Sequence, residues 1–548
     1  MRRAHTTLGS AILTVLIAAP ALAGQSVHIQ GKTAAKRIAP VAAASGESAE
    51  KWFIDGARAA KAGANLRPNQ KKAKNVILFV GDGMGISTVA AARILEGQLK
   101  GHSGEENLLS WERFPYVSLS KTYSANGQTP DSAPTMTAMV TGIKTNQGVL
   151  SVTQKATYND CASANGQGVS TILEVAEALG LATGIVSTAR ITHATPAATY
   201  AHTPNRDWES DAELGADNAA KGCKDIARQL IEFPYGNGLE VALGGGRSYF
   251  LPNTVNDPED AGAKGRRKDG RNLPNEWTSH LANSAYVWNK AQFDAIDPNS
   301  TQHLLGLFER SHMEYEADRA KDAGQEPSLA EMTAKSIDIL KKQGGNNGFF
   351  LMVEGGRIDH AHHAGNAKRA LLDAIAMSDA VRVANQKTSA DDTLIIVTAD
   401  HSHTFTVAGY PDRGNDILGK VVTDGKLALD ANGKPYTTLG YINGPGYRGP
   451  FARPDLTAVD TGDVNYLQEA AVPLDSETHA AEDVGIYARG PGANAFQGVV
   501  EQNVIFHAMA QAQNRLAVFY DSLFGNGGKV APPLMEDDLR AGLGAKRK

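Results

Sequence analysis

The run Val76-Ile77-Leu78-Phe79-Val80, followed by Gly81-Asp82, is the clearest indication of how this chain folds. A short apolar run rich in β-branched residues, without polar alternation, is typical of a strand buried on both faces of a parallel sheet. Three more runs share this character, over residues 349–353, 394–397 and 184–186. We therefore predict an α/β fold in which a large, mostly parallel central sheet is flanked by helices on both faces.

Each run leads straight into residues that carry chemistry. Asp82, Glu354 and Asp400 follow the first three runs, and Arg190 and His193 follow the fourth. In open α/β sheets ligands bind at the carboxyl ends of the strands, so these side chains should meet at one sheet edge. Acids gathered there would repel one another unless something positive lay between them. The pattern indicates a metal site.

Length and charge limit the class of protein. With 548 residues the chain can bury a large core, and one α/β domain with insertions accounts for it. The net charge of −5 offers no basic surface that would indicate a nucleic-acid partner.

Residues 1–23 have the pattern of a secretory signal. Arg2 and Arg3 precede an apolar run over residues 11–19, and Ala21-Leu22-Ala23 is a small-residue cleavage site. The apolar run is shorter than the roughly 20 residues that span a bilayer, so we expect no membrane span in the mature chain. A periplasmic or secreted protein is predicted.

The chain has two cysteines, Cys161 and Cys223. In an oxidising compartment such a pair predicts one disulfide that closes a long loop. The alternative is a thiolate that serves as metal ligand or nucleophile, but neither cysteine has a CxxC partner or a neighbouring histidine.

Composition divides the chain into regions. We expect a signal at 1–23, a flexible lead-in at 24–50, a main domain at 51–525 and a loosely held tail at 526–548. Stretches rich in Gly, Pro and Asp indicate irregular insertions at about 247–300 and 410–466. Alternating patterns predict βαβ units, with helices over residues 51–66, 170–179, 328–342, 364–385 and 501–513, and further strands over residues 239–243 and 484–488.

Asp131-Ser132-Ala133-Pro134 begins a predicted helix with proline in its first turn. Ser132 is open to two interpretations, the residue that caps the helix or a nucleophile. A helix N-terminus offers free amides and a positive dipole end to phosphate. A serine there, beside a metal that stabilises its alkoxide, would serve as a nucleophile.

Histidines and carboxylates recur at spacings that suit metals. Asp359 and His363 lie four residues apart, so both can face one ion from a helical turn. Asp400-His401-Ser402-His403 at a strand end supplies another adjacent pair, whereas His479 stands alone. Spacing predicts two metal sites and leaves their membership open.

Together these residues resemble the alkaline phosphatase family, and several motifs are closer to its animal (tissue-nonspecific/placental-like) branch. The similarity covers roughly residues 51–515, which would then form the catalytic domain. The motifs, in family order, are Asp82-Gly83-Met84-Gly85, Asp131-Ser132-Ala133 with Thr141-Gly142, Val353-Glu354-Gly355-Gly356-Arg357-Ile358-Asp359-His360, Thr398-Ala399-Asp400-His401-Ser402-His403, and Glu477-Thr478-His479-Ala480-Ala481-Glu482-Asp483-Val484.

The resemblance implies two zinc ions and one magnesium ion. The ligand types agree, because imidazole with carboxylate suits zinc and all-oxygen ligands suit magnesium. His193 would act next to the magnesium ligands. The implied sets are Asp359, His363 and His479 for the first zinc; Asp82, Asp400, His401 and Ser132 for the second; and Asp82, Thr195 and Glu354 for magnesium.

The resemblance implies three further features. Arg206, in Thr203-Pro204-Asn205-Arg206, matches the arginine that clamps phosphate with two parallel hydrogen bonds. Cys161 and Cys223 match a disulfide of the animal branch. A calcium site of that branch is matched by Glu259, Phe308, Glu309 and Glu326, although Glu326-Pro327-Ser328 stands where the branch has Asp-Pro-Ser, after a segment of altered length.

The implied activity is hydrolysis of phosphate monoesters through a phosphoserine at Ser132, by a homodimer. A sulfatase is a weaker alternative because Cys161-Ala162-Ser163 is not a Cys-x-Pro-x-Arg site. A phosphodiesterase is disfavoured by Arg206 and by the third metal site, which suit a dianionic phosphate. A non-catalytic phosphate-binding protein would need no nucleophile between two metals.

Overall fold

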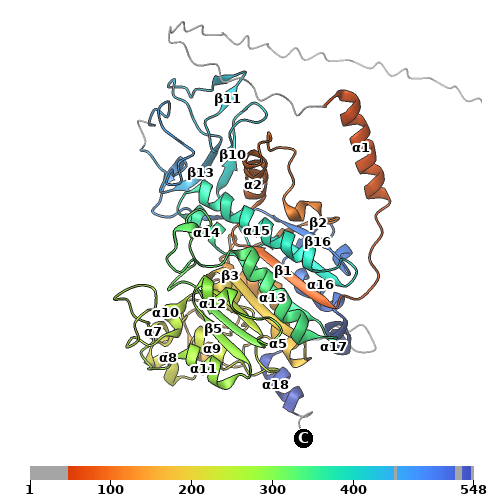
Figure 1. Ribbon diagram of the computed structural model, residues 1–548, viewed down its shortest axis with the longest axis vertical. Helices are drawn as coiled ribbons and strands as arrows, with labels where there is room; N and C mark the ends of the chain where they lie inside the picture. The colour runs from red at the N-terminus through yellow and green to blue at the C-terminus, as the bar shows by residue number, and fades with distance from the viewer. Residues whose placement is uncertain (1–46, 450–452, 525–532, 545–548) are drawn as a thin grey trace, which may run out of the picture. The chain divides into compact units, whose positions relative to one another are not determined.

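In the computed structural model, which describes residues 47–449, 453–524 and 533–544, one large sheet organises the chain (Figure 1). The described residues all fall within one unit, 39–548. In spatial order the sheet contains β17 (Val499–Glu501), β2 (Tyr116–Lys121), β16 (Val484–Arg489), β8 (Thr393–Ala399), β1 (Asn75–Gly81), β7 (Phe349–Gly355), β3 (Ala182–Arg190), β4 (Val241–Gly245), β6 (His303–Leu307) and β5 (Ser284–Val287).

The four apolar runs that predicted the fold form the centre of this sheet. They are β8, β1, β7 and β3, which are neighbours and run parallel. Val80 of β1 lies opposite Glu354 of β7 and Thr398 of β8, so the three strands end at the same level. Only β16 pairs antiparallel within the described sheet, with β2 and β8, so the sheet is mostly parallel as predicted.

Both faces of the sheet are buried. Successive residues of a strand point to opposite sides, and on each side they pack into a hydrophobic cluster. Along β1, Val76, Leu78 and Val80 belong to one hydrophobic cluster, whereas Ile77 and Phe79 belong to another. The first cluster includes side chains of α3 (Ser132–Thr141), α5 (Ile172–Ala178), α9 (Ile226–Ile231), α11 (Leu273–His280) and α16 (Val504–Ala512). The second includes those of α2 (Ile86–Leu99), α13 (Leu329–Gly344) and α15 (Ala367–Lys387), of which α13 and α15 cross the sheet in Figure 1.

Further short elements connect this frame. They are α1 (Ala49–Ala64), α4 (Cys161–Ala164), α6 (Ala194–Ala197), α7 (Asp211–Leu214), α8 (Ala216–Ala220), α10 (Arg247–Phe250), α12 (Lys290–Asp294), α14 (Arg357–His363), α17 (Asn514–Phe524), α18 (Glu536–Gly544), β9 (Ser402–His403) and β15 (His479–Ala480). Among the described residues, no helix is long and apolar enough to cross a membrane.

The two predicted insertions are more ordered than their composition indicates. Residues 247–300 contain α11, α12 and strand β5, which joins the edge of the main sheet through β6. Residues 410–466 contain β13 (Leu439–Gly444), which pairs with the flanking strands β10 (Phe405–Val407) and β14 (Ala470–Pro473) in a separate small sheet. They also contain the hairpin of β11 (Val422–Thr423) and β12 (Lys426–Leu427).

The tail is not loosely held over residues 533–544. Met535 forms a β-bridge with Val169, the Glu536 backbone N–H donates to the carbonyl of Gly168 at 3.0 Å, and the Leu539 side chain is buried. These contacts join the tail to the segment before α5, and the sequence lacked a signal for such long-range pairing. The predicted signal (1–23) and residues 24–46 of the predicted lead-in lie outside the described residues.

Candidate active site and metal centres

Three fully buried carboxylates lie at the carboxyl ends of the central strands. Asp82 follows β1, Glu354 lies near the end of β7 and Asp400 follows β8. Burial and the neighbouring Asp400 charge raise the pKa of Asp82 well above its usual range. Burial likewise raises the pKa of Glu354 to about 7. So many carboxylates without water are costly unless cations pair with them.

Around His401, two of these carboxylates and a hydroxyl converge on one nitrogen. His401 Nε2 lies 3.2 Å from Asp400 Oδ2, 3.3 Å from Asp82 Oδ1 and 3.2 Å from Ser132 Oγ. Burial, with His479 beside it, holds the pKa of His401 well below its usual range, so the imidazole is neutral and able to ligate. One imidazole, two carboxylates and an oxygen form a donor set that suits zinc.

Ser132 stands at the first position of α3 and does not cap the helix. Asp131 is the N-cap, and its Oδ1 accepts from the Ala133 backbone N–H at 2.8 Å. The capping interpretation of Ser132 is therefore wrong, because the preceding residue fills that role. Ser132 Oγ instead points towards Asp82 Oδ1 at 3.3 Å.

A second group contains Asp359, His363 and His479, which lie far apart in the sequence. Asp359 Oδ1 lies 3.3 Å from Nε2 of each histidine, and the two Nε2 atoms are 3.0 Å apart. His363 Nδ1 donates to the carbonyl of Glu477 at 2.5 Å, and His479 Nδ1 donates to that of Pro130 at 2.8 Å. Each Nε2 therefore carries a lone pair, and the two lone pairs face each other beside a carboxylate. This arrangement is suited to a cation.

Three buried oxygens with no hydrogen-bond partner within the described residues mark a third group. They are Asp82 Oδ2, Thr195 Oγ1 and Glu354 Oε1. Buried oxygens are rarely left without a partner, so a ligand is expected here. An all-oxygen set of this kind fits magnesium. His193 lies close to Asp82 and Glu354 and its buried Nδ1 is also unpartnered.

Arg206 lies between this group and α3. Its Nη1 donates to Asp131 Oδ1 at 2.9 Å, and its Nη2 contacts His193 Nε2 at 3.2 Å. The Arg206 side chain is 18% exposed, so it remains accessible to a ligand. Asp131 thus orients the guanidinium and caps the helix that begins with Ser132. An arginine held next to a helix N-terminus is suited to phosphate.

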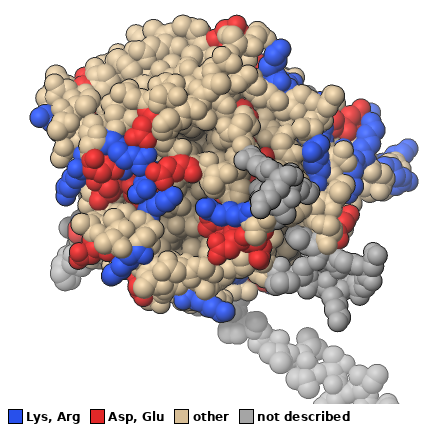
Figure 2. Space-filling model, turned by 90° about the horizontal axis from the view of Figure 1, so that it is seen from below, with Lys and Arg blue, Asp and Glu red and all other residues tan. Residues whose placement is uncertain are grey.

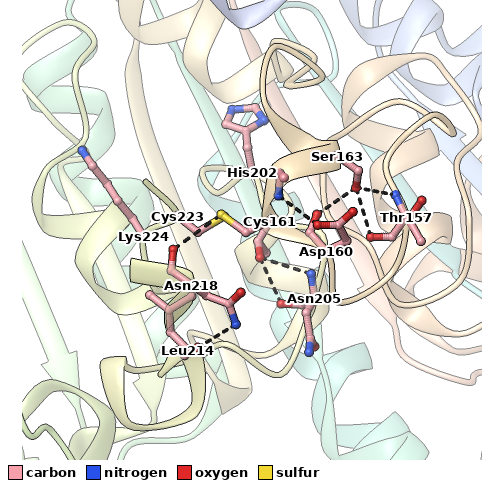
Figure 3. The surroundings of a disulfide bond; sticks show 12 residues. Thr157, Asp160, Cys161, Ser163, His202, Asn205, Leu214, Asn218, Cys223 and Lys224 are labelled. Atoms are coloured by element: carbon pink, nitrogen blue, oxygen red, sulfur yellow. Dashed lines mark hydrogen bonds between the residues drawn. A yellow bond between two sulfur atoms is a disulfide. The ribbon is translucent and has the colours of Figure 1, made fainter. Parts of the chain in front are cut away.

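Cys161 and Cys223 form the predicted disulfide, which supports the Arg206 segment (Figure 3). The loop that it closes contains His193, Thr195 and Arg206. Cys161 is buried in a cluster with Trp208 and Leu214, two and eight residues after Arg206. The thiolate alternative is therefore excluded for both cysteines.

The residues predicted for calcium also come together. Glu259 affects the pKa of Glu309, and Glu309 affects that of Glu326, while Arg247 donates to both Glu259 and the carbonyl of Phe308. Burial, with Glu259 and Asp322 beside it, raises the pKa of Glu309 to about 8. Burial, with Glu309 and Asp322 beside it, raises the pKa of Glu326 to about 10. Hard oxygen donors of this kind are typical of a calcium site.

Sequence reasoning gave no role to four residues at these sites, which are His403, Glu477, Ser187 and Asp322. His403 lies between two carboxylates, with Nε2 2.8 Å from Asp359 Oδ1 and Nδ1 in contact with Glu477 Oε2. Burial opposes its protonation, but these two hydrogen bonds raise the pKa of His403 to about 9. Ser187 Oγ donates to Glu354 Oε2. Asp322 lies by the calcium group. The sequence offered a signal for two of the four, because His403 and Glu477 stand in the motifs quoted above.

Charges of both signs lie side by side on one face of the molecule. On the face shown in Figure 2, lysine and arginine side chains lie next to aspartate and glutamate side chains, without an extended basic field. The protein's acidic net charge of −5 agrees with this distribution.

The sequence of this chain is similar to a known protein family and to several of its members. The family model "Alkaline phosphatase" matches residues 73–515. The tissue-nonspecific alkaline phosphatase of Gallus gallus is 49% identical over 81% of this chain and 85% of its own length, and the alkaline phosphatase of Gadus morhua is 48% identical over 82% and 94%. The human tissue-nonspecific isozyme is 44% identical over 86% and 88%.

Solved structures share the fold. The alkaline phosphatase of the Antarctic bacterium TAB5 aligns with a TM-score of 0.56 and 24% identity over 81% of this chain and 99% of its own. The Thermus thermophilus alkaline phosphatase aligns with a TM-score of 0.58 and 23% identity over 88% and 97%. The clusters of histidine and carboxylate described above agree with the metal dependence of that family. This chain therefore belongs to the alkaline phosphatase family, whose members are phosphomonoesterases.

Proposed function

We propose that this enzyme hydrolyses phosphate monoesters by a two-step transfer through Ser132. The observation that carries the proposal is the position of Ser132 Oγ, which lies 3.2 Å from His401 Nε2 and 3.3 Å from Asp82 Oδ1 at the start of α3. A hydroxyl in that position faces both a metal-ligand set and free helix amides. It is suited to attack phosphorus in line with the departing alcohol.

Two zinc ions are assigned to the two groups that contain histidine. Asp359, His363 and His479 would hold the first, and Asp82, Asp400 and His401 would hold the second together with Ser132. The donor types and the facing imidazole lone pairs support this assignment. When bound, the two ions supply positive charge that lowers the pKa of the Ser132 hydroxyl and of the hydrolytic water.

Magnesium is assigned to Asp82, Thr195 and Glu354. Their unpartnered buried oxygens support this assignment. Asp82 would be shared, because its Oδ1 faces His401 while its Oδ2 belongs to the orphaned set. His193 would orient a water in this group through Nδ1.

Arg206 would bind the substrate. Its fork donates two parallel hydrogen bonds to phosphate oxygens, after exchanging part of its contact with Asp131. Ser132 Oγ then forms a bond to phosphorus while the bond to the alcohol oxygen breaks. Water cleaves the phosphoserine in the second step, which releases inorganic phosphate and restores the hydroxyl. Arg206 stabilises the charge of the transferring group in both steps.

Calcium is assigned to Glu259, Glu309, Glu326 and the carbonyl of Phe308. Glu326 supports this assignment, since the residue is only 2% exposed and its Oε2 has no hydrogen-bond partner within the described residues. Oxygen donors from separate loops, one of them a backbone carbonyl, are the kind that calcium takes.

A homodimer is proposed on the basis of α1. None of its residues is buried, and Trp52 and Phe53 are 59% and 80% exposed. Large aromatic side chains exposed together on a helix indicate a protein surface that covers them. A second copy of the chain is the proposed cover. Sedimentation analysis at micromolar concentration should give the mass of two chains, and the mass of one chain would refute the dimer.

A periplasmic or secreted location is proposed from the predicted signal at residues 1–23. The Cys161–Cys223 disulfide supports it, since disulfides persist in oxidising compartments.

The proposed activity is tested by hydrolysis of a chromogenic phosphate monoester at alkaline pH. Chelation should abolish turnover, and zinc and magnesium together should restore it. Phosphate binding without turnover by the fully metallated protein would indicate a binding protein instead.

A further inference from the structure

The acidic group assigned to calcium contains a carboxylate that the sequence comparison did not include. Asp322 lies in the connection before α13, four residues ahead of Glu326. Its Oδ2 and Glu259 Oε1 lie on the same side of Gly324, where an added Cβ would come within 3.5 Å and 2.5 Å of them, respectively. Its Oδ2 also accepts from the Glu326 backbone N–H at 2.8 Å, which fixes the Asp322 side chain beside Glu326.

The surroundings are built to hold carboxylates towards one point. Glu259 Oε1 accepts from the Gly324 backbone N–H at 2.8 Å, and Glu326 Oε1 accepts from the Glu314 backbone N–H at 3.0 Å. Glu326 Oε2 is buried and unpartnered within the described residues, and Asp322 Oδ2 lies beside the backbone of the same residue. An orphaned buried carboxylate oxygen among further carboxylates indicates a bound cation.

The protein itself neutralises little of this charge. Arg247 donates from Nη2 to Glu259 Oε2 at 2.7 Å, but its Nε and Nη2 also bind both oxygens of Asp257 at 3.0 and 2.8 Å. Its Nη1 donates to the Phe308 carbonyl at 3.0 Å, so this arginine holds Glu259 and the Phe308 carbonyl in place. Glu309, Asp322 and Glu326 remain without a basic partner among the contacts described.

We propose that Asp322 is a direct ligand of the calcium ion, so that this chain binds it with four carboxylates and the Phe308 carbonyl. The inference rests on the calcium site of the proposed function. Asp322 belongs to the segment in which this chain differs from the animal branch. There, Glu326 stands in place of an aspartate and the preceding loop has a different length. A fourth carboxylate adds charge, and the number of charged ligands is what tunes calcium affinity. The site should therefore bind calcium tightly and a trivalent lanthanide more tightly still.

Terbium is the probe for this inference. Trp288 lies 5.5 Å from the Arg247 guanidinium, which contacts Glu259, so excitation of tryptophan should sensitise terbium emission from this site. The enzyme is first loaded with zinc and magnesium, terbium is titrated, and calcium is then added to displace it. Trp288→Phe should remove most of the emission while leaving the calcium affinity unchanged, which assigns the signal to this site.

Asp322→Asn is the decisive variant. The amide oxygen can still accept from the Glu326 backbone N–H, so the change removes charge while retaining the loop contact. Loss of a charged ligand should weaken calcium and terbium binding by about tenfold or more. The matched control is Asp260→Asn, which removes the same charge from an exposed side chain next to Glu259.

The outcomes separate the two hypotheses. Weak binding by Asp322→Asn with normal binding by Asp260→Asn supports ligation. If Asp322→Asn binds calcium as tightly as the wild type, Asp322 is not a ligand, although the calcium site stands. An equal loss of affinity in Asp322→Asn and Asp260→Asn also overturns the role of Asp322, because it would reflect only the loss of a nearby negative charge. Absence of any sensitised emission and of calcium binding in the wild type overturns the calcium site itself, without affecting the zinc-dependent activity.

Discussion

His363 Nε2 faces His479 Nε2 across 3.0 Å, and both nitrogens lie 3.3 Å from Asp359 Oδ1. Since each histidine donates its Nδ1 proton to a backbone carbonyl, the facing nitrogens are both acceptors. Two acceptors and a carboxylate at these distances repel one another unless a cation lies among them. The fold thus brings together donors that a bound cation would stabilise, which agrees with the zinc proposed here.

His363→Ala should remove zinc from this group. The variant loses one of three ligands and keeps the backbone of α14, so its zinc content should fall by one ion per chain and its phosphatase activity should be lost. Elemental analysis after dialysis measures the zinc, and far-UV circular dichroism checks the fold. His360→Ala is the matched control, because the neighbouring histidine contacts Arg357 rather than Asp359. Full zinc content in His363→Ala would contradict the assignment.

Arg206→Ala should weaken phosphate binding. Charge-assisted hydrogen bonds contribute about 1.5–3 kcal/mol, which corresponds to roughly a 10- to 100-fold rise in the inhibition constant of inorganic phosphate. Arg266→Ala is the control, since that arginine pairs with Glu213 on the surface. An unchanged inhibition constant in Arg206→Ala would show that the arginine does not touch the anion.

Removal of the disulfide should affect both stability and phosphate binding. Cys161 and Cys223 are separated by 62 residues in the sequence, and a cross-link over such a loop contributes about 4 kcal/mol in the chain-entropy model. The loop carries Arg206, so the double variant Cys161→Ala/Cys223→Ala should also have a raised KM. Urea unfolding and steady-state kinetics measure the two effects. A destabilised variant with an unchanged KM would separate the disulfide from the Arg206 segment.

His202 should stabilise the fold only below alkaline pH. Burial opposes its charge, but Glu174 at 2.8 Å and Glu536 raise the pKa of His202 from 6.5 to about 9. A raised folded pKa means that the contribution is complete below pH 6.5 and is lost as pH rises through about 9. The shift corresponds to about 3 kcal/mol.

His202→Gln should therefore lower the free energy of unfolding by about that amount at pH 6 and by little at pH 10. Because Glu536 begins α18, amide exchange in the tail should increase first. His102→Gln, at an exposed histidine, is the control for the loss of an imidazole. An equal deficit at both pH values would show that the imidazole acts by packing alone.

The central sheet was predictable because its strands are continuous apolar runs. Strand β2 was missed, since Ser118 and Ser120 are buried in it and interrupt any apolar pattern. Strands β5 and β6 were not predicted, because they follow a stretch rich in Gly, Pro and Asp. They join the sheet only through the pairing of β6 with β4 and of β5 with β6.

The site was predictable only where short motifs carry ligands. Asp82, Asp400 and His401 follow the carboxyl ends of strands, which is where open α/β sheets bind their ligands, so they could be expected to lie together. His403 and Asp322 were not assigned, because their partners Glu477 and Glu309 are distant or lie across a loop of altered length. Such contacts depend on tertiary packing that no local pattern encodes.

Ser132 is proposed to carry the phosphoryl group, and acid quenching during turnover can detect this intermediate. Wild-type enzyme is mixed with a phosphate monoester, quenched in acid and digested, and the peptide that contains Ser132 is analysed by mass spectrometry. We expect one added phosphoryl group on Ser132, and none anywhere in Ser132→Ala. Phosphate on another residue, or a Ser132→Ala enzyme that is labelled and turns over like the wild type, would contradict it.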